Sequence, residues 1–332
     1  MEENDLPSSK ESEKIKMKVA ICGVWHVHTG SYVNAALSLG EVVGVWDEDA
    51  NRGAEFAQAY NLRLFNSLDE LLTSDAEGVI IGSATTSHAD QMVKIANAGK
   101  HIFTEKVMCV TEEECDRVAE AVKKNDVNFV VCMAKKYNAG IKFIKSIVDR
   151  GDIGTINFFR HRMCHGLANE GGLPAHFYKR SETGGGAMID LGAHGMYLID
   201  MFCGVPTSVK SVFTNACING ETNAINSDRV EDNAVTIMSF ENGCIAISET
   251  GFVSTGYPNI IEIGGDKGTI IWQGGKTISM RGLTTGNKMI EVPIEGTDDL
   301  SPVRQFLTGE ILPGGGVEEG RRLTHLMVEA YK

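Results

Sequence analysis

The chain has 332 residues, of which 42% are hydrophobic and 23% charged, and its formal net charge is −13. The length allows two domains with their own cores, and the negative charge argues against nucleic acid or a membrane surface as a partner. No apolar run is long enough to span a bilayer. Residues 1–15 are polar and lack the apolar core of a signal peptide, so we expect a disordered N-terminal extension. The eight cysteines include no C-x-x-C pair, which indicates reduced thiols in a cytoplasmic protein.

The first part of the chain alternates strand-like and helix-like segments. Apolar runs such as VVGVW are followed by amphipathic stretches. Strands are expected at residues 18–23, 41–46, 78–81, 101–104 and 127–132, and helices at 32–39, 51–60, 68–72, 88–98 and 112–124. This repeated order predicts an α/β fold over residues 16–136 with a doubly wound parallel sheet.

Beyond residue 136 the pattern changes to successive strands separated by turns. A helix is expected at 139–149, a strand at 155–161 and a helix that starts at Gly184. Further strands are expected at 209–216, 234–240, 244–251, 259–263 and 269–273, and closing helices at 302–307 and 317–331. Turn sequences such as ENG and GGD favour antiparallel pairing. Residues 137–332 are therefore predicted to form an α+β domain with a large, mostly antiparallel open sheet.

Two segments far apart in the sequence supply candidate catalytic residues. Lys106 follows an apolar strand, and Asp190 and His194 are four residues apart in the helix expected after Gly184. Residues four apart lie on one face of an α-helix, and a carboxylate beside an imidazole orients that ring for proton transfer. Lys106 could add a fixed positive charge beside His194. The trio predicts an enzyme that moves a proton.

The first β-α turn, Gly23 to His28, carries a degraded dinucleotide fingerprint. Of the glycines in G-x-G-x-x-G only Gly23 is present, and Trp25 and His28 occupy the other two positions, unless Gly23 is itself the second glycine. Trp25 should crowd the pyrophosphate, because the second glycine lets the backbone approach it. Asp47 ends the second strand, where an acidic side chain binds the adenosine ribose, although it could equally cap the next helix. Since a carboxylate there disfavours the extra phosphate of NADP, we expect NAD to be preferred.

Several segments together resemble the Gfo/Idh/MocA family, named for glucose–fructose oxidoreductase and inositol dehydrogenase. Residues 42–53, VVGVWDEDANRG, resemble the family's second strand with its acidic end. Residues 83–106, SATTSHADQMVKIANAGKHIFTEK, are similar to the stretch that leads into its E-K-P motif, although Val107 replaces the proline. Residues 184–200, GGGAMIDLGAHGMYLID, resemble its D-x-x-x-H helix, and residues 232–247, DNAVTIMSFENGCIAI, resemble its sheet signature.

The resemblance implies an NAD-binding Rossmann domain over residues 16–136, followed by the α+β domain. It implies an NAD(P)-dependent oxidoreductase that acts on a CH–OH group of a sugar, inositol or related polyol. It assigns catalysis to Lys106, Asp190 and His194. With the first turn included, the residues expected along the cofactor are Gly23, Trp25, His26, Asp47, Thr85, Thr86, His88 and Glu105. The resemblance also implies a homodimer or homotetramer formed through the sheet of the second domain. No bound metal is expected.

The substrate pocket is expected to combine hydrogen-bond donors with aromatic rings, since sugars need both. Beside Lys106, the candidates are Arg160, Arg162, His165, His176 and Tyr178. Arg160 and Arg162 should share one strand face, with His161 on the other. If the arginines face the pocket, the substrate could be an acidic sugar.

In the implied reaction His194 accepts the proton of the substrate hydroxyl while the carbon gives a hydride to the nicotinamide. Asp190 orients the imidazole, and Lys106 stabilises the developing alkoxide. Two alternatives stay open. The altered glycine turn could belong to a non-catalytic NAD-binding protein. The pair His26-x-His28, with Asp190, also echoes metal-dependent hydrolases built on β-α barrels.

Overall fold

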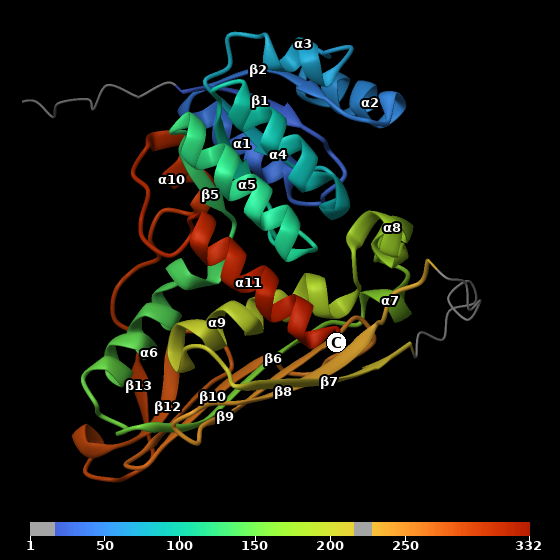
Figure 1. Ribbon diagram of the computed structural model, residues 1–332. Helices are drawn as coiled ribbons and strands as arrows, with labels where there is room; N and C mark the ends of the chain where they lie inside the picture. The colour runs from blue at the N-terminus through green and yellow to red at the C-terminus, as the bar shows by residue number, and fades with distance from the viewer. Residues whose placement is uncertain (1–16, 216–227) are drawn as a thin grey trace, which may run out of the picture.

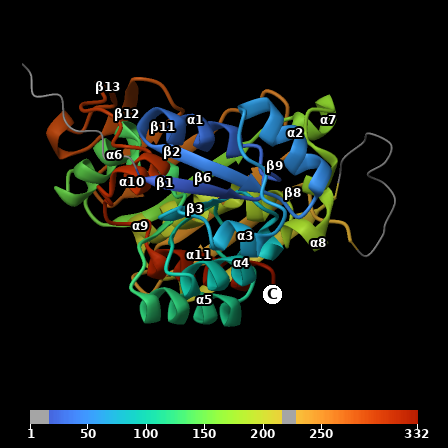
Figure 2. The same ribbon diagram turned by 90° about the horizontal axis from the view of Figure 1, so that it is seen from above.

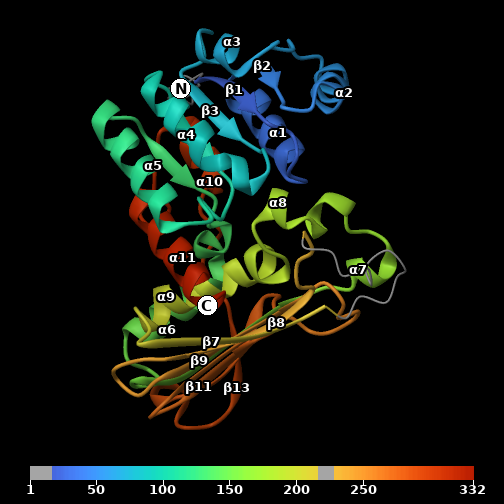
Figure 3. The same cartoon turned by 45° about the vertical axis from the view of Figure 1, so that its right-hand side comes forward.

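The computed structural model describes residues 17–215 and 228–332, and it contains two β-sheets, one above the other (Figure 1). Helices lie between the sheets, and no helix in these residues covers the outer face of the second sheet (Figure 1, Figure 3). Seen from above, the first sheet crosses over the second (Figure 2). The extension expected at residues 1–15 lies outside the described residues. None of the described helices is long and apolar enough to cross a membrane, and the seven described cysteines are free thiols.

The first sheet is parallel, with the strand order β2-β1-β3-β4-β5. Its strands are β1 (Lys18–Cys22), β2 (Glu41–Trp46), β3 (Gly78–Ile81), β4 (His101–Thr104) and β5 (Phe129–Val131), and its helices are α1 (Thr29–Leu39), α2 (Ala50–Tyr60), α3 (Leu68–Leu72), α4 (His88–Asn97) and α5 (Glu112–Asn125). β1 and β3 are apolar and almost wholly buried, as expected for parallel strands covered on both faces. Thr111 and Glu114 form a capping box that fixes the start of α5. This sheet confirms the predicted Rossmann fold.

The second sheet has the order β13-β12-β11-β10-β6-β9-β8-β7 and is antiparallel except between β6 and β9. Its strands are β6 (Ile156–Cys164), β7 (Ser208–Thr214), β8 (Asn233–Ser239), β9 (Ile245–Gly251), β10 (Ile260–Gly265), β11 (Thr269–Trp272), β12 (Thr277–Arg281) and β13 (Ile290–Pro293). The helices of this part are α6 (Ala139–Asp149), α7 (Leu167–Glu170), α8 (Arg180–Thr183), α9 (Ala193–Cys203), α10 (Pro302–Thr308) and α11 (Val317–Ala330). The predicted α+β fold with an open sheet is confirmed, but the sequence reasoning missed β12, β13, α7 and α8.

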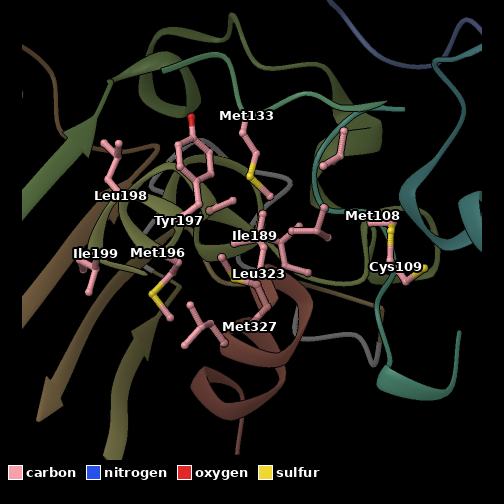
Figure 4. Close-up of a cluster of buried hydrophobic side chains, with 14 of the residues drawn as sticks. Met108, Cys109, Met133, Ile189, Met196, Tyr197, Leu198, Ile199, Leu323 and Met327 are labelled. Atoms are coloured by element: carbon pink, nitrogen blue, oxygen red, sulfur yellow. The ribbon is translucent and has the colours of Figure 1, made fainter. Parts of the chain in front are cut away.

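A shared core joins the two sheets. Met196 and Tyr197 of α9 pack with Leu323 and Met327 of α11, and Met108 from the loop after β4 belongs to the same buried cluster (Figure 4). α10 returns to the first sheet and packs on α1 and β5. Because these side chains are close-packed, the loop after β4 is fixed against α9.

Candidate active site

A buried ion pair links the end of β4 to the segment before α9. The Lys106 ammonium donates to the Asp190 carboxylate at 2.7 Å and to the Asp190 carbonyl oxygen at 2.9 Å. Burial opposes the charge on Lys106, but the carboxylates of Asp190 and Glu105 outweigh this effect and raise the pKa of the lysine. Despite burial, Lys106 lowers the pKa of Asp190. Both groups are therefore charged at neutral pH, and Lys106 presents a fixed positive charge.

The helical segment that carries Asp190 and His194 begins with a wider turn than the sequence predicts. Met188–Gly192 is π-helical, and α9 follows it. A π-turn closes after five residues rather than four, so the two side chains do not lie one above the other. Asp190 turns to Lys106, and His194 Nδ1 lies 2.7 Å from the hydroxyl oxygen of Tyr197. This corrects the expected Asp190–His194 contact.

Tyr197 is a functional candidate that the sequence reasoning missed. It lies three residues after His194, a spacing that brings side chains together on a helix and could have revealed it. Its hydroxyl oxygen also accepts the backbone amide of Lys135 at 3.2 Å. Burial, followed by the charges of Lys106 and Lys135, lowers the pKa of His194 well below its usual value. The imidazole is therefore neutral at neutral pH and can accept a proton.

Lys106 and His194 line the same cavity of about 590 Å³. His28 and Glu105 border it from the first sheet, and residues 301–304 border it from the start of α10. Cavities of a few hundred Å³ are typical of sites for small organic ligands. The proton acceptor and the fixed positive charge can therefore act on the same bound molecule.

A carboxylate anchors the chain just before Asp190. Glu231 Oε1 accepts the amides of Gly186 at 2.9 Å and Met188 at 3.0 Å, and the hydroxyl of Tyr331 at 2.6 Å. A side chain at Gly186 is impossible, since its Cβ would lie 1.9 Å from the Glu231 carbonyl oxygen. The sequence reasoning missed Glu231 and Tyr331, because neither stands near the site in the sequence.

The first β-α turn keeps features of a dinucleotide site. Gly23 has a φ of +82°, and a Cβ there would lie 2.5 Å from Ser83 Cα, so the position requires glycine. α1 has no side-chain cap and no acidic residue in its first turn, which suits an anionic pyrophosphate. At the end of β2, Asp47 accepts the amide of Val24 at 2.7 Å and pairs with Arg52 at 2.7 Å. These features fit the adenosine and pyrophosphate end of NAD.

Trp25 closes the other end of the cleft. Its ring packs on Phe177 with centroids 5.1 Å apart, and its Nε1 donates to Glu182 at 2.5 Å. The hydroxyl of Thr86 donates to a backbone carbonyl of α8 at 2.7 Å, and α8 lies close to the first sheet in Figure 3. The cavity left beside Trp25 is about 20 Å³, enough for about one water molecule. The space beside Trp25 is therefore too small for a nicotinamide ring while Phe177 and α8 keep these positions.

Two other residues expected along the cofactor lie in different surroundings. Thr85 lines the small cavity beside Trp25. His88 is only 1% exposed, and its ring nitrogens each lie 3.2 Å from a backbone carbonyl oxygen, those of Val107 and Ser83. His88 is therefore a buried residue that links the loop after β4 to the chain after β3. This corrects its expected position along the cofactor.

Glu105 is buried beside two imidazoles. Its Oε1 lies 3.0 Å from Nδ1 of His28 and 3.6 Å from Nδ1 of His26, and it accepts the hydroxyl of Tyr32. Although burial favours the protonated acid, the two imidazoles and Lys106 hold the pKa of Glu105 below its usual range. Burial lowers the pKa of His26 to about 4. A carboxylate therefore faces a neutral imidazole at the first turn.

The two arginines expected in the substrate pocket lie on the outer face of the second sheet. Arg160 forms salt bridges of 2.8 and 3.0 Å with glutamates of β9 and β10, and Arg162 lies over the ring of Tyr257. His161 points to the opposite face, where its buried ring lies beside Gly195 of α9. The alternation of the strand is as predicted, but the arginines face away from His194. This corrects their assignment to the pocket, and the argument for an acidic sugar loses its basis.

The remaining substrate candidates precede α8 or lie near it. The ring of His165 stacks on Phe252 with centroids 5.3 Å apart. The ring of His176 lies 4.6 Å from that of Trp25, and Tyr178 packs against the small cluster that includes Phe252. All three stay candidates for substrate contacts.

Comparison with known proteins places the chain in a family. Residues 17–133 match a family model described as an oxidoreductase family with an NAD-binding Rossmann fold, and residues 141–271 match the GFO/IDH/MocA C-terminal domain. The chain belongs to the Gfo/Idh/MocA family of oxidoreductases, and its first part is an NAD-binding Rossmann domain. The alternative of a β-α barrel hydrolase is wrong, because the second sheet is open and mostly antiparallel.

The chain is similar to several named proteins. The scyllo-inositol 2-dehydrogenase (NADP(+)) of Bacillus subtilis is 27% identical over 237 residues, which cover 70% of this chain and 68% of that protein. An uncharacterized oxidoreductase of Streptococcus pneumoniae is 25% identical over 226 residues, 67% of this chain but only 59% of the relative. The solved structure of levoglucosan dehydrogenase with NADH and levoglucosan has a TM-score of 0.77 at 18% identity, covering 95% of this chain and 96% of that one. This likeness shows a shared fold.

Proposed function

We propose that the protein is an NAD-dependent dehydrogenase that oxidises a CH–OH group of a sugar, inositol or related polyol. The observation that carries the proposal is the charged Lys106–Asp190 pair beside a neutral His194, with Lys106 and His194 lining one cavity. Doubly wound sheets bind their ligands at the carboxyl ends of the strands, where Lys106 lies. The names of the inositol and levoglucosan dehydrogenases support a polyhydroxylated substrate.

The chain's own residues supply a charge and a proton acceptor. Lys106 donates a hydrogen bond to the reacting oxygen and stabilises the alkoxide, while Asp190 holds the ammonium in place. His194 accepts the hydroxyl proton at Nε2. For this, Nδ1 must carry its own hydrogen and donate it to Tyr197, whose oxygen has lone pairs for this bond and for the Lys135 amide. NAD⁺, when bound, supplies the acceptor for the hydride that leaves the substrate carbon.

We also propose that NAD is preferred over NADP. Asp47 stands at the end of β2, where its carboxylate would repel the additional phosphate of NADP. Titration of the purified protein with NADH and NADPH tests this, and much weaker binding of NADPH is expected. Equal affinities would mean that Arg52 turns from Asp47 to the phosphate, and would refute the preference.

Turnover tests the dehydrogenase itself. The protein is mixed with NAD⁺ and a panel of inositols, aldoses, linear polyols and aldonates, and formation of NADH is followed by absorbance. For any substrate found, His194→Ala should lower kcat/KM by about 10²–10⁴-fold with the fold intact. Equal rates in the folded variant and the wild type would contradict the assigned role of His194.

A non-catalytic NAD-binding protein is the second candidate. Trp25 favours it, because the indole fills the position of the second glycine and closes the nicotinamide end of the cleft. The two candidates differ in one outcome. A protein that binds NADH but oxidises no member of the panel would support the non-catalytic candidate.

We propose that the outer face of the second sheet forms the interface of a homodimer or homotetramer. Val212, Val235, Ile237 and Ile245 of the adjacent strands β7, β8 and β9 are between 39% and 69% exposed on this face. Contiguous exposed apolar side chains are typical of protein interfaces. Light scattering should show an oligomer that Ile237→Glu dissociates, and a monomeric wild type would contradict the proposal. A cytoplasmic location stays a prediction.

A further inference from the structure

His26, His28 and Glu105 bring three metal-ligating groups together at the first β-α turn. One ligand atom from each residue lies within 4.8 Å of the others. The Glu105 carboxylate oxygen lies 3.0 Å from His28 Nδ1 and 3.6 Å from His26 Nδ1. His26 Nδ1 accepts the backbone amide of His28 at 3.2 Å, so this nitrogen carries the lone pair, and a bound ion would replace the amide as its partner.

These separations match the surroundings of a zinc ion. Zn²⁺ binds histidine nitrogens and carboxylate oxygens at about 2.0–2.2 Å, usually with tetrahedral geometry. Tetrahedral ligand atoms at that radius lie about 3.3–3.6 Å from one another. The two separations to Glu105, 3.0 and 3.6 Å, lie at or near this range, and the third, between the two imidazole nitrogens, is within 4.8 Å. Side-chain rotations that bring the two imidazoles together and free His26 Nδ1 from the His28 amide would place all three ligands around one ion.

The cluster is built before any ion binds. Glu105 is 1% exposed and His26 is 8% exposed, so little ordering is required of either side chain. The hydroxyl of Tyr32 donates to the same Glu105 oxygen, as outer-shell groups do when they orient a metal-binding carboxylate. The neighbouring ammonium of Lys106 is held by the Asp190 carboxylate, which leaves Glu105 Oε1 to the two imidazoles and Tyr32.

We propose that His26, His28 and Glu105 bind one divalent transition-metal ion, and their chemistry favours zinc. Three protein ligands leave the fourth tetrahedral position for water or a substrate oxygen, the arrangement of catalytic rather than structural zinc sites. His28 and Glu105 line the cavity shared with Lys106 and His194, so the ion would border that space. The sequence predicts no metal, because Glu105 joins the two histidines only in the fold. Metal binding goes beyond the dehydrogenase and does not depend on it.

Zinc binding by the full-length protein tests this proposal. Untagged protein, first stripped with a chelator, is titrated with Zn²⁺ alone in competition with a chromophoric indicator. We expect one zinc per chain, and we expect His28→Gln and Glu105→Gln each to weaken binding by at least about tenfold, since even an outer-shell change has effects of that size. The side chain of His28 is 55% exposed, so His28→Gln should fold even if Glu105→Gln does not.

The matched control is His325→Gln. His325 belongs to a second cluster, with Glu112 and Glu329, on the surface of α5 and α11. Its loss should leave both the affinity and the stoichiometry of the tight site unchanged. The proposal is overturned if no zinc binds, if His28→Gln binds zinc like the wild type, or if zinc is lost with His325 instead. NADH titration of zinc-free samples reports on the cofactor site, to which His26 and Glu105 are also expected to contribute.

Discussion

Replacing Trp25 with alanine should tighten the binding of NADH. The indole packs on Phe177 and donates to Glu182, and these interactions must break before the nicotinamide end of the cleft can open. When only an open form can bind, the apparent affinity falls by the fraction of molecules that are open. Weakening the closed form raises that fraction, so the variant should bind better although it lacks a large aromatic side chain.

The size of the effect follows from the hydrogen bond and the ring stacking that hold Trp25 in the closed form. A hydrogen bond from the indole to a carboxylate is worth about 1.5 kcal/mol, and a stacked aromatic pair adds about 1 kcal/mol. Their sum of about 2.5 kcal/mol corresponds to a factor of about 70 in an equilibrium constant. Because the bond from Thr86 to α8 stays in the variant, we expect NADH to bind between about 10-fold and 70-fold more tightly.

The assay is a titration followed by the fluorescence of NADH, which does not require Trp25. Glu182→Gln should give a smaller gain, since the amide oxygen still accepts the indole hydrogen. Trp272→Ala is the matched control, because it removes an equal side chain from β11 in the second sheet. The reasoning is refuted if Trp25→Ala binds NADH as weakly as the wild type, or more weakly, while its melting temperature shows a folded protein.

Three further outcomes are expected. Tyr197→Phe should lower kcat about tenfold with KM unchanged, because a hydrogen bond of about 1.4 kcal/mol no longer orients His194. An unchanged kcat would show that Tyr197 does not orient the imidazole. The pKa of His194 is lowered well below its usual value of 6.5, and a base acts in its deprotonated form. Thus kcat/KM for oxidation should stay constant as pH falls through 6.5, and a decline centred at that pH would contradict the assignment. Asp47→Asn should reduce the ratio of NADH to NADPH affinity by at least about tenfold, because a charge of the same sign as the NADP phosphate is removed. Competitive titration measures this ratio, and an unchanged ratio would contradict the role of Asp47.

The sequence predicts the fold well wherever apolar runs end at turn residues. The bounds of β2, β3 and β4 coincide with the expected residues 41–46, 78–81 and 101–104. β12 and β13 were missed because short strands near a sheet edge carry no apolar run: Ile290 of β13 is 44% exposed. The short helices α7 and α8 were missed for a different reason, since four residues are too few to show a helical period.

The site was only partly predictable. A sequence motif predicts that Lys106, Asp190 and His194 share one site. Which of them pair depends on the π-helical turn, and the spacing of the residues does not predict that turn. Likewise, a period of two predicts that Arg160 and Arg162 share a face, but not which face meets α9. That choice depends on the tertiary packing of the sheet.

The most direct test of the central claim is the rate of NADH formation by the wild type, Lys106→Met and a matched surface variant, Lys94→Met. Lys94 is exposed on α4 and should not matter. We expect the wild type and Lys94→Met to oxidise the same polyol or sugar at the same rate. Lys106→Met, shown to be folded by circular dichroism, should lose about 10²–10³-fold in kcat, the usual effect of removing a group that stabilises a developing oxyanion. Wild-type turnover by Lys106→Met, or a wild type that binds NADH but oxidises no substrate, would contradict the claim.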